Sequence, residues 1–174
     1  GYVKADLSYD SSRVSTGNFA RWVDRDNVRG HDSQGNLTAK ETRLGMKIKG
    51  PSSDNIKTSG VVEVDFFGDG AAENKGVLMM RHAYLQIDWI KEKFSILAGQ
   101  TWDVISPLNP SVLNYSVQWW AGNIGYRRPQ IRLTKIFDVA KDVEWKLEAA
   151  ATRNIGDATG FHPVDSGADS GLPV

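Results

Sequence analysis

The chain has 174 residues, in which 21 Lys and Arg residues balance 21 Asp and Glu residues. This neutrality gives no overall field that would attract nucleic acid, so we expect no nucleic-acid partner. The absence of cysteine excludes disulfides, thiolate metal sites and cysteine nucleophiles. No uninterrupted apolar run reaches the roughly 18 residues that a transmembrane helix needs.

Segments in which apolar and polar residues alternate follow one another along the chain, and such alternation predicts strands with two different faces. In the last of them Trp145 and Leu147 share one parity, while Glu144, Lys146 and Glu148 hold the other. With their flanks the segments extend over roughly 9–11 residues, which suits a tilted strand that crosses a bilayer. Soluble strands are usually nearer 5–6 residues. The seven predicted strands cover residues 3–10, 43–49, 61–66, 82–89, 94–101, 128–134 and 143–152.

The polar face of these strands carries full charges at alternate positions, so that face must be in water. In a soluble β-sandwich the wet face lies outside and the apolar face packs on a second sheet. In a membrane barrel the wet face lines a lumen and the apolar face meets lipid. Alternation alone is compatible with both.

The links between the predicted strands separate these two folds. Long links at 12–37, 68–76 and 103–123 alternate with shorter ones at 50–55, 90–93 and 136–142. Outer-membrane barrels have short periplasmic turns and longer extracellular loops, whereas a sandwich has no reason to keep this rhythm. The pattern therefore predicts an all-β fold, an antiparallel transmembrane β-barrel of the bacterial outer membrane, with the N-terminus periplasmic.

Seven strands do not complete such a barrel. Bacterial single-chain barrels have an even number of strands, and an open sheet edge is not tolerated in lipid. We therefore expect residues 1–174 to be the N-terminal portion of a single larger barrel domain. Residues 154–174 are expected to form an extracellular loop or tail that leads to a further strand.

A set of short sequences in the middle of the chain resembles the DcaP-like porins of Gram-negative outer membranes. The order and spacing match over roughly residues 1–153, although the C-terminal half of a family member has no counterpart here. The matching sequences are Thr42-Arg43-Leu44-Gly45, Val62-Glu63-Val64-Asp65-Phe66-Phe67-Gly68, Arg81-His82-Ala83-Tyr84-Leu85 and Leu97-Ala98-Gly99-Gln100-Thr101-Trp102.

This resemblance implies a homotrimeric barrel about twice as long as this chain, with about 16 strands. It also implies a passive channel for small anionic, dicarboxylate-like solutes. The expected surroundings are the lipid bilayer and lipopolysaccharide.

The link 103–123 is the candidate constriction loop. It is longer than the roughly 12–15 residues beyond which loops are usually functional or disordered. It is also unusually apolar for an extracellular loop, so we expect it to fold into the lumen or to pack on a neighbouring subunit. The alternative is a surface loop with a small core of its own. Its candidate constriction residues are Asn114, Tyr115, Trp119 and Trp120.

Charged residues on the wet parity are candidates for pore selectivity, because a pore selects by diameter and lining charge. Arginine binds carboxylates in a planar fork, so a row of arginines in a narrow lumen would attract anions. The opposite charges either pair across neighbouring strands or set up a field across the pore. Arg81 falls on the apolar parity, where it would reach the interface or contact a partner subunit. The candidate lining residues are Arg43, Lys47, Glu63, Asp65, His82, Tyr84, Arg127, Arg128 and Arg132.

Motifs for catalysis or for cofactor and metal binding are missing from the sequence. It has no GxSxG elbow, phosphate loop or HExxH spacing, so we expect no enzyme, no cofactor and no metal site. His82 beside Tyr84 is expected to be a hydrogen-bonded lumen residue. The alternatives to a channel are a plugged outer-membrane barrel and a soluble or surface β-sandwich. Such a sandwich would bind carbohydrate through Trp22, Trp119 and Trp120.

Overall fold

The computed structural model describes residues 1–14, 23–25, 31–68, 75–105, 108 and 126–153. These residues form strands and no helix, which confirms the all-β fold. Over the same residues there is no helix with the length and apolarity that spanning a membrane demands. The strands are β1 (Asp6–Asp10), β2 (Gln34–Thr38), β3 (Leu44–Ser52), β4 (Ile56–Asp65), β5 (Met79–Trp89), β6 (Phe94–Trp102), β7 (Arg127–Ala140) and β8 (Val143–Thr152).

A two-stranded sheet joins β1 to β2 in antiparallel register, with Leu7 opposite Leu37 and Asp10 opposite Gln34. Strand β2 overlaps the end of residues 12–37, which the sequence predicted to be a link, so that prediction was wrong in part. The segment has a single large apolar residue, Leu37, and a glycine at position 35. Its alternation is therefore too weak to mark it as a strand, and its pairing with β1 defines it.

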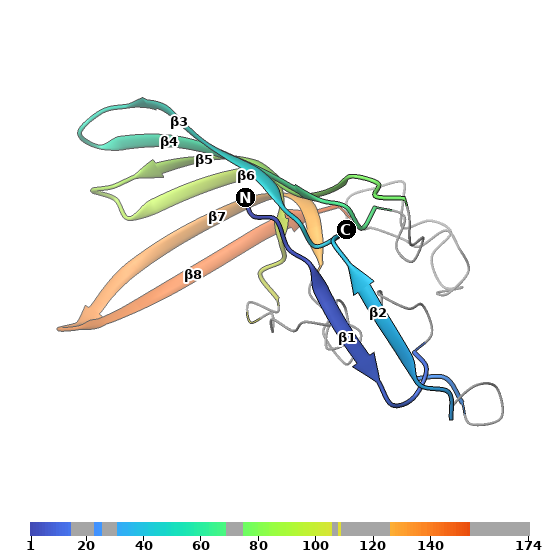
Figure 1. Cartoon of the computed structure of the whole chain (residues 1–174). Coiled ribbons are helices and arrows are strands. Elements are labelled where there is room, and N and C mark those ends of the chain that lie inside the picture. The colour runs from blue at the N-terminus through green and yellow to red at the C-terminus, as the bar shows by residue number, and fades with distance from the viewer. Residues whose placement is uncertain (15–22, 26–30, 69–74, 106–107, 109–125, 154–174) are drawn as a thin grey trace. The chain divides into compact units, whose positions relative to one another are not determined.

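A six-stranded sheet has the order β3-β4-β5-β6-β7-β8, so each strand lies beside its neighbours in sequence (Figure 1). Strand β7 pairs with β8 from Gln130 opposite Thr152 to Ala140 opposite Val143. Only Lys141 and Asp142 connect these two strands, so the predicted turn at 136–142 was too long. The alternation stops where Ile136 and Phe137 are both apolar, yet both stay in register, opposite Lys146 and Trp145.

The short turns between β3 and β4, β5 and β6, and β7 and β8 reverse the chain sharply, and hydrogen bonds join the first two of them. Lys93 and Asp142 have positive φ angles of 46° and 63°, as a sharp reversal between strands requires. The side chain of Asn55, in the β3–β4 turn, accepts a hydrogen bond from the Lys91 backbone N–H at 2.8 Å. It also donates to the Glu92 carboxylate at 2.9 Å. One asparagine thus fixes two neighbouring turns to each other.

Gly99 allows β5 and β6 to approach closely. Its φ of +131° is a conformation that side chains rarely adopt. A Cβ at this position would collide with the Ala83 carbonyl oxygen and would lie 2.6 Å from the Tyr84 Cα. Only glycine therefore fits opposite Tyr84 in this sheet.

Two compact units make up the chain. The first consists of Gly1–Met46, Glu63–Arg81 and Ser106–Ile124, and the second of Lys47–Val62, His82–Ile105 and Gly125–Val174. The site residues below are grouped within one unit or the other.

Candidate functional site

The two faces of β5 to β8 differ in the kind of residue that they expose. The register aligns Leu85, Ala98, Ile131 and Ala151 across the four strands, and this side is called the apolar face. The opposite side, the polar face, aligns Tyr84, Gly99, Gln130 and Thr152 in the next row.

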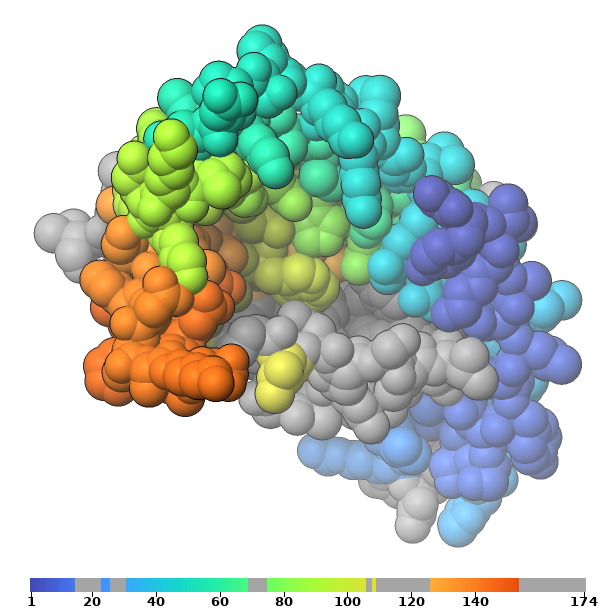
Figure 2. Space-filling view, turned by 90° about the vertical axis from the view of Figure 1, so that its left-hand side faces the viewer, coloured from blue at the N-terminus to red at the C-terminus, as the bar shows by residue number. Residues whose placement is uncertain are grey.

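Burial on these faces is the reverse of that in a soluble protein. On the apolar face Leu85 is 68% exposed and Trp145 is 61% exposed, whereas Gln130 on the polar face is 5% exposed. Among the described residues the buried apolar side chains are only Val14, Phe67 and Leu97. Figure 2 shows the β7–β8 hairpin, in orange, at the surface of the molecule. Soluble proteins hide large apolar side chains, so this arrangement fits a sheet with lipid on one side and water on the other.

Arg81 is the centre of a buried ion-pair group in the first unit. Its Nε donates to Glu63 Oε1 at 2.9 Å, and its Nη1 donates to Asp65 Oδ2 at 2.7 Å. The Asp65 side chain is fully buried, and its other oxygen accepts from the Phe67 backbone N–H at 3.2 Å. Glu63 and Asp65, both predicted pore-lining residues, are therefore held in ion pairs with Arg81.

The prediction that Arg81 lies on the apolar side was wrong. Arg81 bonds to Glu63 and Asp65, and the next residue, His82, lies against Thr101, so two consecutive side chains of β5 have polar partners. The two-residue period therefore breaks between these positions. A buried guanidinium with two carboxylate partners replaces the expected interfacial arginine.

The same network continues to Arg43. Its guanidinium lies 3.8 Å from Glu63 and 3.6 Å from Glu41, and Glu41 also pairs with Lys4. Opposite charges therefore pair between neighbouring segments here, as one of the two alternatives from the sequence expected. The charges of this group largely neutralise each other, so their field falls off over a short distance.

Asp103 and Arg128 close the base of the candidate constriction loop. The Asp103 N–H donates to the Tyr126 carbonyl at 2.8 Å, and the Asp103 carboxylate accepts from the Tyr126 N–H at 3.1 Å. The same carboxylate oxygen lies 3.1 Å from Arg128 Nε. Arg128 also stacks over the Tyr126 ring, 5.3 Å from its centroid. The predicted lining arginine thus holds the two ends of the loop.

Arg132 is held by a second polar group. Its Nε donates to Gln130 Oε1 at 3.1 Å, its Nη2 also donates to the Trp102 carbonyl, and its Nη1 lies 3.5 Å from Glu148. The amide nitrogen of Gln130 donates in turn to the Thr101 carbonyl at 3.0 Å. This buried amide therefore fixes both the strand pairing and the direction of Arg132.

His82 and Tyr84 lie together on the polar face, as expected, with ring centroids 6.4 Å apart in an edge-to-face contact. His82 Nδ1 lies 3.0 Å from Thr101 Oγ1, which is a hydrogen bond in either tautomer. Arg127 lies over the Trp102 ring, 4.6 Å from its centroid, so it packs on that ring by a cation–π contact. Lys47 is exposed.

Three partner residues of this face were missed from the sequence: Thr101, Asp103 and Gln130. Thr101 and Asp103 have the same parity as Leu97 at the end of a predicted strand, and Gln130 has the same parity as Arg128 and Arg132. A polar residue on the wet parity next to an arginine was the available signal. The constriction residues Asn114, Tyr115, Trp119 and Trp120, Trp22 and the tail 154–174 lie outside the described residues.

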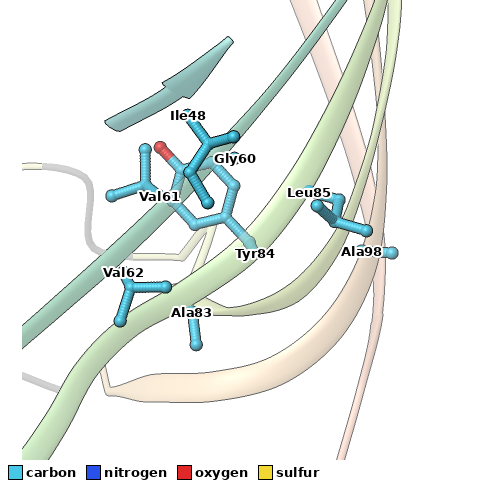
Figure 3. A pocket seen from close by; sticks show the side chains of 8 residues that line it. All are labelled: Ile48, Gly60, Val61, Val62, Ala83, Tyr84, Leu85 and Ala98. Atoms are coloured by element: carbon cyan, nitrogen blue, oxygen red, sulfur yellow. The ribbon is translucent and has the colours of Figure 1, made fainter. Parts of the chain in front are cut away.

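The described part of the chain brings no three His, Asp or Glu side chains together in a group that could hold a metal ion. A shallow depression of about 250 Å³ lies around Gly60 within the second unit. Figure 3 shows Leu85 beside Ala98 in its wall, where the register also places them opposite each other. The lining is almost wholly apolar: Ile48, Gly60, Val61, Val62, Ala83, Tyr84, Leu85 and Ala98.

Comparisons with known proteins agree with this geometry. A search of the curated proteins gave no match. Among solved structures, the crystal structure of the outer membrane channel DcaP of Acinetobacter baumannii matches with a TM-score of 0.66 and 27% sequence identity. The match covers 92% of this chain and 42% of that channel's chain, so this chain spans less than half of its length. The family model for the DcaP outer membrane protein matches residues 1–165. The chain thus belongs to the DcaP outer membrane protein family and is located in the bacterial outer membrane.

Proposed function

We propose that this chain forms part of the wall of a passive diffusion channel for small anionic, dicarboxylate-like solutes. The observation that carries the proposal is the inverted burial of the two sheet faces, with exposed leucine and tryptophan on one side and buried glutamine on the other. A sheet of this kind is stable when its apolar face meets lipid and its polar face borders an aqueous lumen. A soluble sandwich would require the opposite burial.

The apolar face of the complete channel would lie against the lipid bilayer and lipopolysaccharide, and three copies would assemble as a homotrimer. Support for the channel role comes from the family and from the matched structure, which is an outer membrane channel. The preference for anions rests on cationic side chains of the polar face that are exposed to water, such as Lys47. In a lumen, fixed positive charges raise the local concentration of anions and lower that of cations.

Single-channel conductance of the full-length protein in a planar bilayer tests this function. With asymmetric potassium chloride we expect current steps grouped in threes and a reversal potential displaced towards that of chloride. Replacing chloride by succinate should leave a measurable anion current. Absence of current from protein that is folded in detergent would contradict the channel role, and a reversal potential towards potassium would contradict the anion preference.

A further inference from the structure

Three lysines, Lys47, Lys49 and Lys57, gather at the turn end of the β3–β4 hairpin, and all three are exposed. The register of this hairpin follows from its glycines. A Cβ at Gly60 would lie 3.7 Å from the Ile48 Cβ, and a Cβ at Gly50 would meet the Thr58 side chain. Position 48 is therefore opposite 60, and position 50 is opposite 58.

This register places all three lysines on the polar face. Ile48 and Gly60 belong to the apolar side, because a Cβ at Gly60 would lie 3.3 Å from the Leu85 side chain. Odd-numbered positions of the hairpin then point to the opposite side, since successive side chains of a strand alternate. Lys49 is a diagonal neighbour of Lys57, and Lys47 follows two residues along the same strand. Such neighbours lie roughly 7–8 Å apart.

On β4 no carboxylate lies directly opposite these lysines, and the next acid of that strand, Glu63, pairs with Arg81. The positions opposite Lys47, Lys49 and Lys57 are Val61, Ser59 and Pro51. In the described part of the structure none of the three ammonium groups forms an ion pair, whereas Arg43, Arg81, Arg128 and Arg132 each lie within 4.0 Å of a carboxylate.

Strand β5 brings one acid, Asp88, across from Lys57, because the Ile90 backbone N–H donates to the Asn55 carbonyl and so aligns β5 with β4. Asp88 Oδ1 accepts hydrogen bonds from Gln86 Nε2 and Ser95 Oγ, both at 2.7 Å. These donors hold the carboxylate between Gln86 of the same strand and Ser95 of β6, and this one acid stands against three lysines. The three lysines therefore keep a net positive charge in this part of the hairpin.

We propose that Lys47, Lys49 and Lys57 are the residues that give the channel its anion selectivity, and that the arginines mainly hold the wall together. An ion pair acts on a passing solute only as a dipole. An unpaired charge acts over a Debye length, about 8–10 Å at 0.10–0.15 M salt. A lysine ammonium is also a compact, strongly hydrated charge, which attracts an anion without the planar fork that would retain it. This inference rests on the proposed function.

The test is the permeability ratio of chloride to potassium in the full-length protein, taken from the reversal potential in asymmetric salt. The triple variant K47Q/K49Q/K57Q should lower this ratio by about two- to fivefold, as Coulomb's law gives for a few unit charges at nanometre range in water. The matched control K75Q/K91Q/K141Q removes the same charge from exposed lysines in loops and turns and should leave the ratio unchanged.

Folding of every variant is checked by heat-dependent migration of the barrel in gel electrophoresis. A charge-reversal variant, K47E/K49E/K57E, should turn the preference towards cations. An unchanged ratio in the glutamine triple variant, or an equal loss in the loop control, would overturn the lysine assignment while the channel role stands. A wild-type protein that carries no current would overturn the proposed function itself, and the lysine assignment with it.

Discussion

Two regions of this chain are stabilised in opposite ways. In the first unit, the group around Asp65 and Arg81 buries two full charges, with Asp65 at 0% exposure. In the second unit, the β7–β8 hairpin leaves Trp145 and Leu147 more than half exposed. A soluble protein of this size would bury the tryptophan and expose the aspartate. Polar contacts therefore hold the strands together on one face, while the apolar face depends on lipid for its stability.

The largest expected effect comes from breaking the buried ion pair by Asp65→Ala. Arg81 would keep Glu63 but would lose the partner 2.7 Å away, in a place where its side chain is only 5% exposed. Leaving a buried charge without its partner costs about 3–5 kcal/mol. Guanidinium unfolding in detergent micelles, followed by tryptophan fluorescence, should show a lower free energy of unfolding. In the double variant D65A/R81M the loss of unfolding free energy should be smaller, because no buried guanidinium is left without its partner. An unchanged unfolding midpoint in D65A would show that the Asp65–Arg81 pair does not stabilise the fold.

A charge on the apolar face should have the next largest effect. Leu133 lies near the middle of β7 and is 43% exposed, so Leu133→Arg would place a guanidinium in lipid. The expected cost is about 2–4 kcal/mol at the bilayer midplane. The control is Thr134→Arg, which faces the opposite side beside Glu148 and should change stability little. Unfolding from phospholipid vesicles compares the two variants, and equal losses would remove the distinction between lipid-facing and lumen-facing positions.

The strands and their faces could be predicted from the sequence because alternation is a local property. Each predicted segment contains or overlaps an observed strand, and the apolar parity of residues such as Leu85 and Ile131 is the exposed side. Strand β2 was not predicted, because its five residues carry one large apolar side chain. Its place in the fold depends on a partner strand more than twenty residues away.

The contacts of the candidate site could not be predicted, because they depend on how neighbouring strands are aligned. Nothing in the sequence near Arg132 shows that its partners are Gln130, the Trp102 carbonyl and Glu148. The pairing of Arg128 with Asp103 likewise joins residues separated by a long loop. The sequence therefore indicated that Arg128 and Arg132 lie on the polar face and that opposite charges could pair across strands, but not which carboxylate each arginine contacts.

The smallest expected effect comes from an exposed ion pair, whose charges are in water, unlike those of Asp65 and Arg81. Lys93, in the β5–β6 turn, lies 2.7 Å from Glu144 and also donates to Asp138. The hydrogen bond that Lys93 donates to Asp138 is the main reason why the pKa of Lys93 is raised above its usual 10.5. The contact that raises the lysine pKa stabilises the folded state at every pH below 10.5. This stabilisation is lost only as the pH rises above that value.

Lys93→Met, which keeps the methylene stem and removes the charge, should leave the unfolding midpoint unchanged within error at both pH 7 and pH 9. Water surrounds Lys93 and both of its partners and screens their attraction, and a bond between exposed side chains also costs conformational freedom. The unfolding midpoint of this variant is measured beside that of D65A under the same conditions. A loss as large as that of D65A would mean that the exposed turn stabilises the sheet as much as the buried pair does, and that burial does not decide how much a charge contributes in this chain.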